Sequence, residues 1–414
     1  MTEPKVCILT ETYYPVVGGG ETQARLLAEG LTSSGLPVVV VTRRSDDSLR
    51  KTEVIGPVTV HRLSPVGRGQ LKKWGLIFTV IPTLVRLRRQ YDVLFVSGFR
   101  IVGATAVLVG KLFGKPCVLK ADSQGEMSGE FFRAGLGAFG LSWAWRPFRV
   151  LLRLRNLVLR RAEAFVAITS DGARELADGG VAVDAVRMIP NSVDTARFCP
   201  VNERQKISLR QKLEIPLASR VFTYTGRLVS YKGLPLLLRA WEAIHHRHAN
   251  VTLLLVGTGG LDIHNCETDL RQYVSAQDLG RTVRFAGEVQ NVNEYLQASD
   301  VFVFPTENDA FPSSLVEAMS CGLPVIATPV GAISTIVNPD VSGILVPAGD
   351  CQQLQDALER LVVDVSLASR LGGHARLSVK EKYSAATVSG SYIDLFREVT
   401  PAYAGRELEA KSSS

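Results

Sequence analysis

The sequence predicts an α/β protein of two domains, each with a parallel sheet covered by helices. A chain of 414 residues is long enough for two separate hydrophobic cores. Short apolar runs typical of buried strands alternate with helical stretches in both halves. A turn-rich segment, PNSVD at 190–194, interrupts the alternation, which then restarts. We therefore place one domain at 1–192 and a second at 193–384, and expect 405–414 to be a disordered tail.

Seven strands are expected in the first half: Val6–Leu9, Pro37–Thr42, Val58–Arg62, Val93–Val96, Cys117–Lys120, Phe165–Ile168 and Arg187–Ile189. A loop containing Gly18, Gly19 and Gly20 leads from the first strand to an amphipathic helix over Glu21–Leu31. Glycines there allow a phosphate or sugar to approach the backbone closely, although an ordinary flexible loop has the same composition. The pattern is not G-x-G-x-x-G, so it does not indicate a dinucleotide site.

Six strands are expected in the second half: Val221–Tyr224, Val251–Val256, Val283–Ala286, Val301–Phe304, Val325–Thr328 and Gly343–Val346. Arg227 follows the first of them and Lys232 lies where the next helix begins. Two cations beside a helix N-terminus suit a diphosphate, although most Arg and Lys side chains are simply solvated. The VGTGG run around Gly257 is weaker evidence for a nucleotide base or phosphate site.

The stretch 305–331 places two acids, Asp309 and Glu317, after a buried strand and on a short helix expected from Ser314 to Cys321. Ligands bind at such strand ends in open α/β sheets. Ser314 and Glu317 also form S-x-x-E, so a helix capping box is the competing explanation for Glu317.

Composition narrows the class of protein. Hydrophobic content of 46% and charged content of 21% are ordinary for a globular protein, and we expect no membrane span, no secretion signal and a cytosolic location. Six scattered cysteines without C-x-x-C indicate neither a disulfide framework nor zinc. We expect no metal site, including at His245, His246 and His248, and no cofactor. The net charge of +7 is too mild to indicate nucleic acid.

Four motifs occur in one order: GGGET at 18–22, GRLVSYKG at 226–233, VGTGG at 256–260, and D-x7-E within DAFPSSLVEAMSCGLPVIAT, with IPNSVD at 189–194 joining the halves. Together they resemble the retaining glycosyltransferases of family 4 (glycosyltransferase group 1), which have the GT-B fold. The resemblance covers nearly the whole chain and implies two Rossmann-like domains whose sheets face an interdomain cleft. It also implies that 385–404 is a helix crossing back to the first domain.

The resemblance implies roles for individual residues. Arg227 and Lys232 would hold the diphosphate of a nucleotide-sugar donor without metal, and Asp309 would meet the donor sugar. Glu317 would bind the ribose hydroxyls. Backbone amides around Phe311, Ser313, Ser314 and Leu315 would assist, with Gly257 nearby and Gly19 approaching the donor phosphates or the acceptor.

Two positions depart from the family pattern. The first acid of the motif is usually Glu, whereas here Asp309 is one methylene shorter, and Glu307 lies close by. The family often has His where Asp122 falls in KADSQGE, so Asp122 and Ser123 are the candidate residues on the acceptor side. The acceptor itself is a glycan, a lipid or a small molecule.

Every charged residue between Phe131 and Ala162 is Arg, and Arg146, Arg149, Arg153 and Arg160 share one helical face. Trp143, Trp145 and Phe148 lie near its start, and a second basic cluster, Arg86, Arg88 and Arg89, follows the apolar run 76–84. This pattern is typical of a core helix with a solvated face, and equally of a helix that lies peripherally on the inner, anionic face of a membrane.

We therefore expect a metal-independent, retaining glycosyltransferase that acts on a lipid-linked or polysaccharide precursor. Two alternatives remain: a sugar-nucleotide epimerase of similar fold, which would release epimerised nucleotide sugar without acceptor, and a non-catalytic nucleotide-sugar-binding subunit, which would bind donor without turnover.

Overall fold

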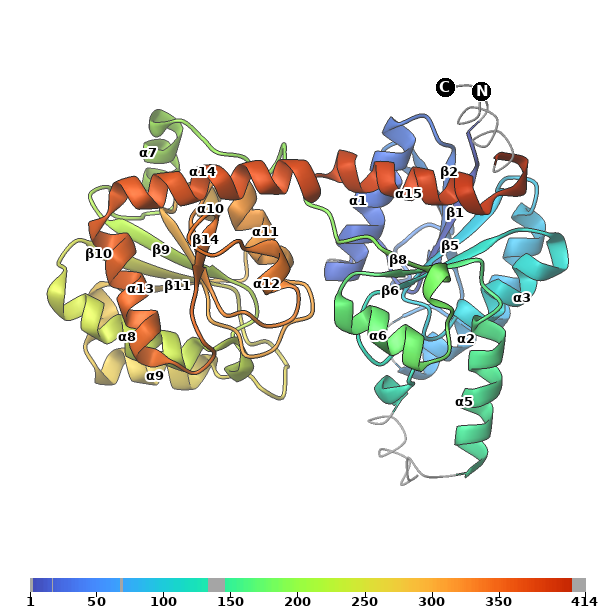
Figure 1. The fold of residues 1–414 in the computed structure, drawn as a ribbon, viewed down its shortest axis with the longest axis horizontal. Coiled ribbons are helices and arrows are strands. Elements are labelled where there is room, and N and C mark those ends of the chain that lie inside the picture. Colours follow the sequence, from blue (N-terminus) through green and yellow to red (C-terminus); the bar gives the residue numbers. More distant parts are fainter. Residues whose placement is uncertain (1–2, 17, 68–69, 133–145, 404–414) are drawn as a thin grey trace. The chain divides into compact units, whose positions relative to one another are not determined.

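The computed structural model describes residues 3–16, 18–67, 70–132 and 146–403. Trp143 and Trp145 of the basic segment, and the expected tail at 405–414, fall outside these ranges. The chain divides into two compact units (Figure 1). Unit 1 comprises Met1–Ser192 with Ala385–Ser414, and unit 2 comprises Val193–Ser384.

Unit 1 contains an eight-stranded sheet in the order β3-β4-β2-β1-β5-β6-β7-β8. The strands are β1 (Val6–Thr10), β2 (Val38–Arg43), β3 (Thr52–Ile55), β4 (Val58–Leu63), β5 (Val93–Ser97), β6 (Cys117–Ala121), β7 (Ala164–Ala167) and β8 (Val186–Met188). The helices are α1 (Gly19–Ser33), α2 (Gln70–Leu87), α3 (Gly103–Phe113), α5 (Arg146–Leu159), α6 (Ser170–Asp178) and α15 (Ala385–Val399), with 3-10 turns η1 (Glu130–Phe132) and η2 (Val183–Ala185).

Strand β3 is absent from the sequence prediction, and it is the one antiparallel neighbour in this sheet among the described residues. It pairs with β4 at the sheet edge, where its side chains alternate between exposed and half-buried. A four-residue edge strand, Thr-Glu-Val-Ile, with only two apolar side chains lacks the continuous apolar run that marks the buried parallel strands, so the apolar pattern did not reveal it.

Two groups of helices cover the two faces of this sheet. Helices α1 and α15 lie side by side on one face (Figure 1), with Leu27, Tyr392 and Phe396 in the core beneath them. Helices α2, α3 and α6 and the end of α5 pack on the other face. The helix that begins at Ala385 therefore completes the core of unit 1.

Unit 2 contains a six-stranded, fully parallel sheet in the order β11-β10-β9-β12-β13-β14. The strands are β9 (Arg220–Thr225), β10 (Val251–Val256), β11 (Val283–Gly287), β12 (Val301–Phe304), β13 (Val325–Ala327) and β14 (Gly343–Leu345). The helices are α7 (Glu203–Lys212), α8 (Leu234–Arg247), α9 (Glu267–Ala276), α10 (Val292–Gln297), α11 (Ser313–Ser320), α12 (Ile333–Ile336), α13 (Cys351–Val363) and α14 (Val365–Lys382), with turns η3 (Ser230–Lys232) and η4 (Leu279–Arg281).

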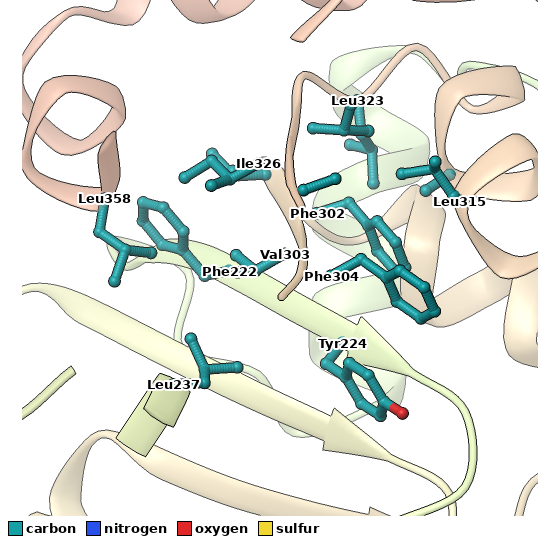
Figure 2. Close-up of a cluster of buried hydrophobic side chains, with 14 of the residues drawn as sticks. Phe222, Tyr224, Leu237, Phe302, Val303, Phe304, Leu315, Leu323, Ile326 and Leu358 are labelled. Atoms are coloured by element: carbon teal, nitrogen blue, oxygen red, sulfur yellow. The ribbon is translucent and has the colours of Figure 1, made fainter. Parts of the chain in front are cut away.

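The core of unit 2 lies around the two central strands. Figure 2 shows Phe222 and Tyr224 of β9 near Phe302 and Phe304 of β12. The rings of Tyr224 and Phe304 stack with centroids 5.8 Å apart. This packing fixes the ends of β9 and β12 and therefore the loops that follow them.

Each sheet reverses its strand order beside its first strand, between β1 and β5 in unit 1 and between β9 and β12 in unit 2. Connections on opposite sides of such a point leave the sheet in opposite directions and open a crevice at the carboxyl ends of the strands. Most of the residues predicted to be functional follow β1, β9 or β12, whereas Asp122 and Gly257 follow the neighbouring strands β6 and β10.

Candidate active site

Lys232 and Asp309 meet at the strand-order reversal of unit 2. Lys232 ends the turn after β9, and Asp309 lies in the loop after β12. The Lys232 Nζ atom lies 2.7 Å from Asp309 Oδ2 and donates a 3.1 Å hydrogen bond to the Asn308 carbonyl. The two side chains are 11% and 18% exposed, so water screens this pair only partly. Glu307, the other acid of the loop, is exposed.

Glycine makes this meeting sterically possible. Gly233 has a φ of +71°, and a Cβ atom there would lie 1.9 Å from the Pro305 carbonyl oxygen. Gly331 has a φ of +54°, and a Cβ atom there would lie 1.9 Å from the Asp309 carbonyl oxygen. Glycine at 233 therefore lets the loops after β9 and β12 approach each other, and glycine at 331 lets the segment after β13 approach the Asp309 loop.

Arg227 lies on the same edge but has different partners. Its guanidinium donates to the Asp262 carboxylate and, at 2.8 Å, to the Tyr231 hydroxyl. The Arg227 side chain is 60% exposed, whereas that of Lys232 is almost covered. Arg227 is therefore an accessible cation, and Asp262 competes for it with any anion that binds there.

We predict that Asp262→Asn lowers the donor KM about 3- to 10-fold with kcat unchanged, because removing one carboxylate charge beside the exposed Arg227 guanidinium is worth about 1 kcal/mol to an anion bound there. Steady-state kinetics at low salt measures this. Asp269→Asn, an exposed residue of α9 with the same charge change, is the control. A donor KM that is unchanged or raised in Asp262→Asn contradicts the prediction.

Gly257 is placed by backbone contacts. Its amide donates to the Gly287 carbonyl at 2.8 Å, and its φ is +136°. A Cβ atom there would lie 1.9 Å from the Gly226 carbonyl oxygen, next to Arg227. Glycine is needed at position 257 because the two loops at the strand ends approach each other closely there. The Gly257 amide already donates a hydrogen bond within the protein.

The competing explanation of Glu317, a capping box with Ser314, is wrong. Helix α11 begins at Ser313 with Pro312 as its N-cap residue, and no side chain caps it. Ser314 is therefore the second residue inside the helix, two positions after the N-cap. The Leu315 amide donates to the Pro312 carbonyl at 3.1 Å and its side chain is buried, so it does not offer the free amide that was expected. Ser313 and Ser314 hold the first two helix amides, which have no partner within the helix.

Phe311, just before this helix, packs against the core of unit 2, with its ring 6.1 Å from that of Tyr383. Glu317 lies one turn into α11. Burial raises the pKa of its carboxyl to about 7, although nearby Arg197 lowers it. Because Glu317 does not take part in capping α11, no capping contact within the helix explains an acid at this position.

Asp122 occupies the strand-order reversal of unit 1, as part of a charged cluster. Its Oδ1 lies 2.7 Å from the Nζ of buried Lys120, and its Oδ2 accepts a 2.7 Å hydrogen bond from the Ser97 hydroxyl. Lys120 also donates to Asn191 Oδ1 at 2.9 Å. The Asp122 carboxylate is thus held by a fixed cation and a hydroxyl.

The neighbouring loop is held by two more acids. The Glu126 Oε1 atom accepts the Asp122 and Ser123 amides at 3.0 and 3.2 Å. Burial, followed by the charge of Asp122, raises the pKa of Glu126 to about 7. Glu175 of α6 accepts three more amides, those of Gly125, Met127 and Ser128, at 2.7 to 2.9 Å.

Gly19 and Gly20, predicted to lie in a loop, are the first two residues of α1, with Gly18 as the N-cap residue. Gly19 is exposed, and nothing lies within 4 Å of where its Cβ atom would stand. A Cβ atom at Gly20 would lie 3.7 Å from Asp122 Oδ2. The start of α1 therefore stands beside Asp122 with open space at Gly19.

Sequence reasoning missed Lys120, Ser97, Glu126 and Glu175. A lysine at the end of an otherwise apolar buried strand was the available signal for Lys120. Across the part of the chain that the structure describes, no group of three or more His, Cys, Asp or Glu side chains is arranged to hold a metal ion, and no helix is long and apolar enough to span a membrane.

Two family models match the chain, one largely within each unit. The model described as glycosyltransferase family 4 matches residues 17–197, and the model described as glycosyl transferases group 1 matches residues 219–364. The chain belongs to the family 4, group 1 glycosyltransferases. The resemblance found from the ordered motifs is confirmed, as is the enzyme class.

Curated relatives agree with this assignment. This glycosyltransferase is 27% identical to a D-inositol 3-phosphate glycosyltransferase of Saccharomonospora viridis over 95% of this chain and 92% of that enzyme. An enzyme of the same name from Corynebacterium jeikeium is 31% identical, over 59% of each chain. That match therefore spans less than two thirds of the relative.

Solved structures confirm the GT-B fold of this glycosyltransferase. Sucrose-phosphate synthase from Thermosynechococcus elongatus has a TM-score of 0.75 and 22% identity, over 96% of this chain and all of that one. Anabaena HepE in complex with UDP and glucose has a TM-score of 0.72 and 18% identity, over 95% of this chain and 99% of that one.

Proposed function

We propose that this glycosyltransferase moves a sugar from a nucleoside diphosphate to an acceptor hydroxyl, with retained anomeric configuration and without a metal or cofactor. The observation that carries the proposal is the ion pair of Lys232 and Asp309 at the strand-order reversal of unit 2, with the exposed cation of Arg227 on the same edge. The similarly folded HepE was solved with UDP-glucose, which supports a nucleotide sugar as donor.

Each residue supplies one part of the chemistry. Arg227 and Lys232 would neutralise the departing diphosphate, and such fixed cations stabilise charge that develops in the transition state. Asp309 would accept hydrogen bonds from the donor sugar, and Glu317 from the ribose hydroxyls. Two hydroxyl donors would stabilise the carboxylate form of Glu317, which burial disfavours.

Asp122 is assigned an orienting role, because both of its carboxylate oxygens are already engaged within the protein, by Lys120 and by Ser97. In the proposed mechanism an oxygen of the departing diphosphate takes the proton of the acceptor hydroxyl, on the same face of the sugar as the leaving group. Asp122 and Ser123 would orient the acceptor.

Thermal-shift measurements with UDP-, GDP- and ADP-sugars in EDTA test the donor assignment. A ligand at 100 times its Kd stabilises the folded protein by about 2.7 kcal/mol, so the correct nucleotide class should raise the Tm by several degrees. No shift with any of the three classes contradicts the proposal.

Product analysis then separates the alternatives. Incubating the stabilising nucleotide sugar without acceptor should give slow hydrolysis to free sugar and nucleoside diphosphate. Release of an epimerised nucleotide sugar would identify an epimerase, and tight binding with neither product nor transfer would identify a binding subunit.

We also propose peripheral association with the anionic inner face of a membrane, which suits a lipid-linked acceptor. Helices α2, α3 and α5 pack successively on one face of unit 1, and none of their residues is acidic. Their exposed apolar side chains are Trp74, Phe78, Ile81, Leu108, Leu112, Val150, Leu151, Leu154 and Leu157. On α5, Arg146, Arg149 and Arg153 are exposed as well.

Vesicle sedimentation tests this association. Each Arg or Lys near an anionic bilayer contributes about 1 kcal/mol, and salt screens that contribution. We expect sedimentation with phosphatidylglycerol vesicles at low salt and markedly less at high salt. No sedimentation at low salt contradicts the proposed association.

A further inference from the structure

Helix α5 has two faces with different partners. Val150, Leu154 and Leu157 recur every three or four residues and are 53 to 55% exposed, beside a stripe formed by Arg146, Arg149 and Arg153. The opposite face carries Arg155 and Asn156, whose side chains hydrogen-bond within unit 1. The outer face has the apolar and basic character that suits an anionic bilayer.

The inner face of α5 holds the loop that contains Asp122 and Ser123. Arg155 Nη2 donates to the Glu126 carbonyl at 2.8 Å, and Asn156 Nδ2 donates to the Met127 carbonyl at 2.9 Å. The loop also packs tightly on the helix, since a Cβ atom at Gly129 would lie 2.6 Å from the Leu152 side chain.

Side chains hold this loop along its whole length. Five of its amides, those of Asp122, Ser123, Gly125, Met127 and Ser128, are bound by the carboxylates of Glu126 and Glu175. Glu126 is 1% exposed, and its second oxygen lacks a hydrogen-bond partner among the described residues. The contacts from Arg155 and Asn156 of α5 add two hydrogen bonds to the loop's carbonyls.

An aromatic cluster extends the connection to α2. The ring of Trp74 stacks on that of Phe132 at 5.3 Å, and Phe132 meets Phe148 of α5 edge-on at 5.8 Å. The Arg155 guanidinium lies 5.8 Å from the centroid of the Phe132 ring. Packed aromatic groups therefore connect Trp74 and Phe148 with Arg155.

We propose that α5 links the membrane to the acceptor loop: an anionic bilayer binds its outer face, and Arg155 and Asn156 on its inner face then hold residues 122–128 in the form that receives an acceptor presented at the bilayer. This inference rests on the proposed membrane association and on the acceptor role of Asp122 and Ser123. It assigns Arg155 and Asn156 as positioning residues.

Hydrogen exchange measured by mass spectrometry tests the link without knowledge of the acceptor. The full chain is compared alone, with phosphatidylcholine vesicles, and with vesicles of phosphatidylcholine containing about one third phosphatidylglycerol. We expect the anionic vesicles alone to slow amide exchange over 122–128 at least about 5-fold. An unchanged exchange rate over 122–128 in sedimented wild-type protein overturns the inference.

Variants separate the two faces. Leu154→Asp with Leu157→Asp should lose both sedimentation and the slowed exchange, whereas Leu217→Asp, at a 52% exposed leucine of unit 2, should keep both. Asn156→Ala and Arg155→Gln should still sediment with anionic vesicles, but the vesicles should no longer slow their amide exchange over 122–128. Slowing equal to wild type in both inner-face variants overturns the inference, and circular dichroism checks that each variant is folded.

The thermal shift caused by the donor is measured on the same variants. If the donor still raises the Tm but anionic vesicles do not slow amide exchange over 122–128, only the link through α5 is overturned. Absence of any donor shift in the wild type overturns the proposed sugar transfer itself.

Discussion

Replacing Lys232 with Ala is expected to lower the kcat for sugar transfer about 10²- to 10³-fold, the usual loss when one preorganised group that stabilises developing charge is removed. The Nζ atom of Lys232 lies 2.7 Å from Asp309 and is largely covered, so water cannot replace it well. Loss of the cation also leaves Asp309 without its ion-pair partner, which further disfavours an incoming diphosphate. Single-turnover kinetics at saturating donor measures the effect on the chemical step.

Lys212→Ala is the matched control. Lys212 is a 60% exposed lysine of the same unit that pairs with Glu294, and its loss should leave transfer unchanged. Circular dichroism and the Tm establish that Lys232→Ala is folded. Turnover within about 3-fold of wild type in folded Lys232→Ala would refute the role assigned to this lysine.

Glu317→Gln is expected to make unliganded stability less sensitive to pH while weakening donor binding. The pKa of Glu317 is raised to about 7 in the folded protein, from an ordinary value of 4.5, chiefly by burial. The folded state therefore binds the proton more tightly than the unfolded state, and ionisation removes stability as pH rises from about 4.5 through 7. Gln cannot ionise, so the variant gains stability relative to wild type over that window.

The gain at pH 8 over pH 5 should be on the order of 1–2 kcal/mol, because the half-buried carboxyl retains some contact with water that screens its charge. Urea denaturation of both proteins at the two pH values measures it. The exposed Glu307→Gln is the control, with no such pH-dependent gain. If the difference in the free energy of unfolding between Glu317→Gln and wild type is the same at pH 5 and pH 8, ionisation of Glu317 does not carry the stability cost assigned to it.

The same substitution should raise the Kd for the donor about 10-fold, since an amide oxygen accepts hydrogen bonds from the ribose hydroxyls less strongly than a carboxylate. Titration calorimetry with the stabilising nucleotide measures this. A buried acid that costs stability and improves ligand binding is the pattern expected of a functional residue. Unchanged affinity would instead assign Glu317 a structural role.

Most strands could be predicted because the sheets are parallel and buried on both faces, which leaves continuous apolar runs such as Val301–Phe304. Strand β3 could not, because this edge strand has only four residues, two of them polar, and therefore has no such run. The helix start at Ser313 was also missed, since the S-x-x-E spacing of Ser314 and Glu317 fits a capping box equally well. A local sequence pattern therefore does not decide at which residue a helix begins.

Site residues could be predicted individually, but their partners could not. Lys232 and Asp309 are 77 positions apart, and only the adjacency of β9 and β12 brings them together. The same holds for Asp122 and Ser97, which meet because β5 and β6 are neighbours. Strand order is set by the packing of the whole sheet, so spacing along the chain does not contain this information.

A crystal structure of the enzyme with the stabilising nucleotide sugar, grown in EDTA, tests the central claim most directly. The account predicts diphosphate oxygens within hydrogen-bonding distance of both Arg227 and Lys232, with the Arg227–Asp262 contact broken or lengthened and the ribose hydroxyls on Glu317. A nucleotide bound elsewhere, or bound here with its diphosphate away from both cations, would contradict it.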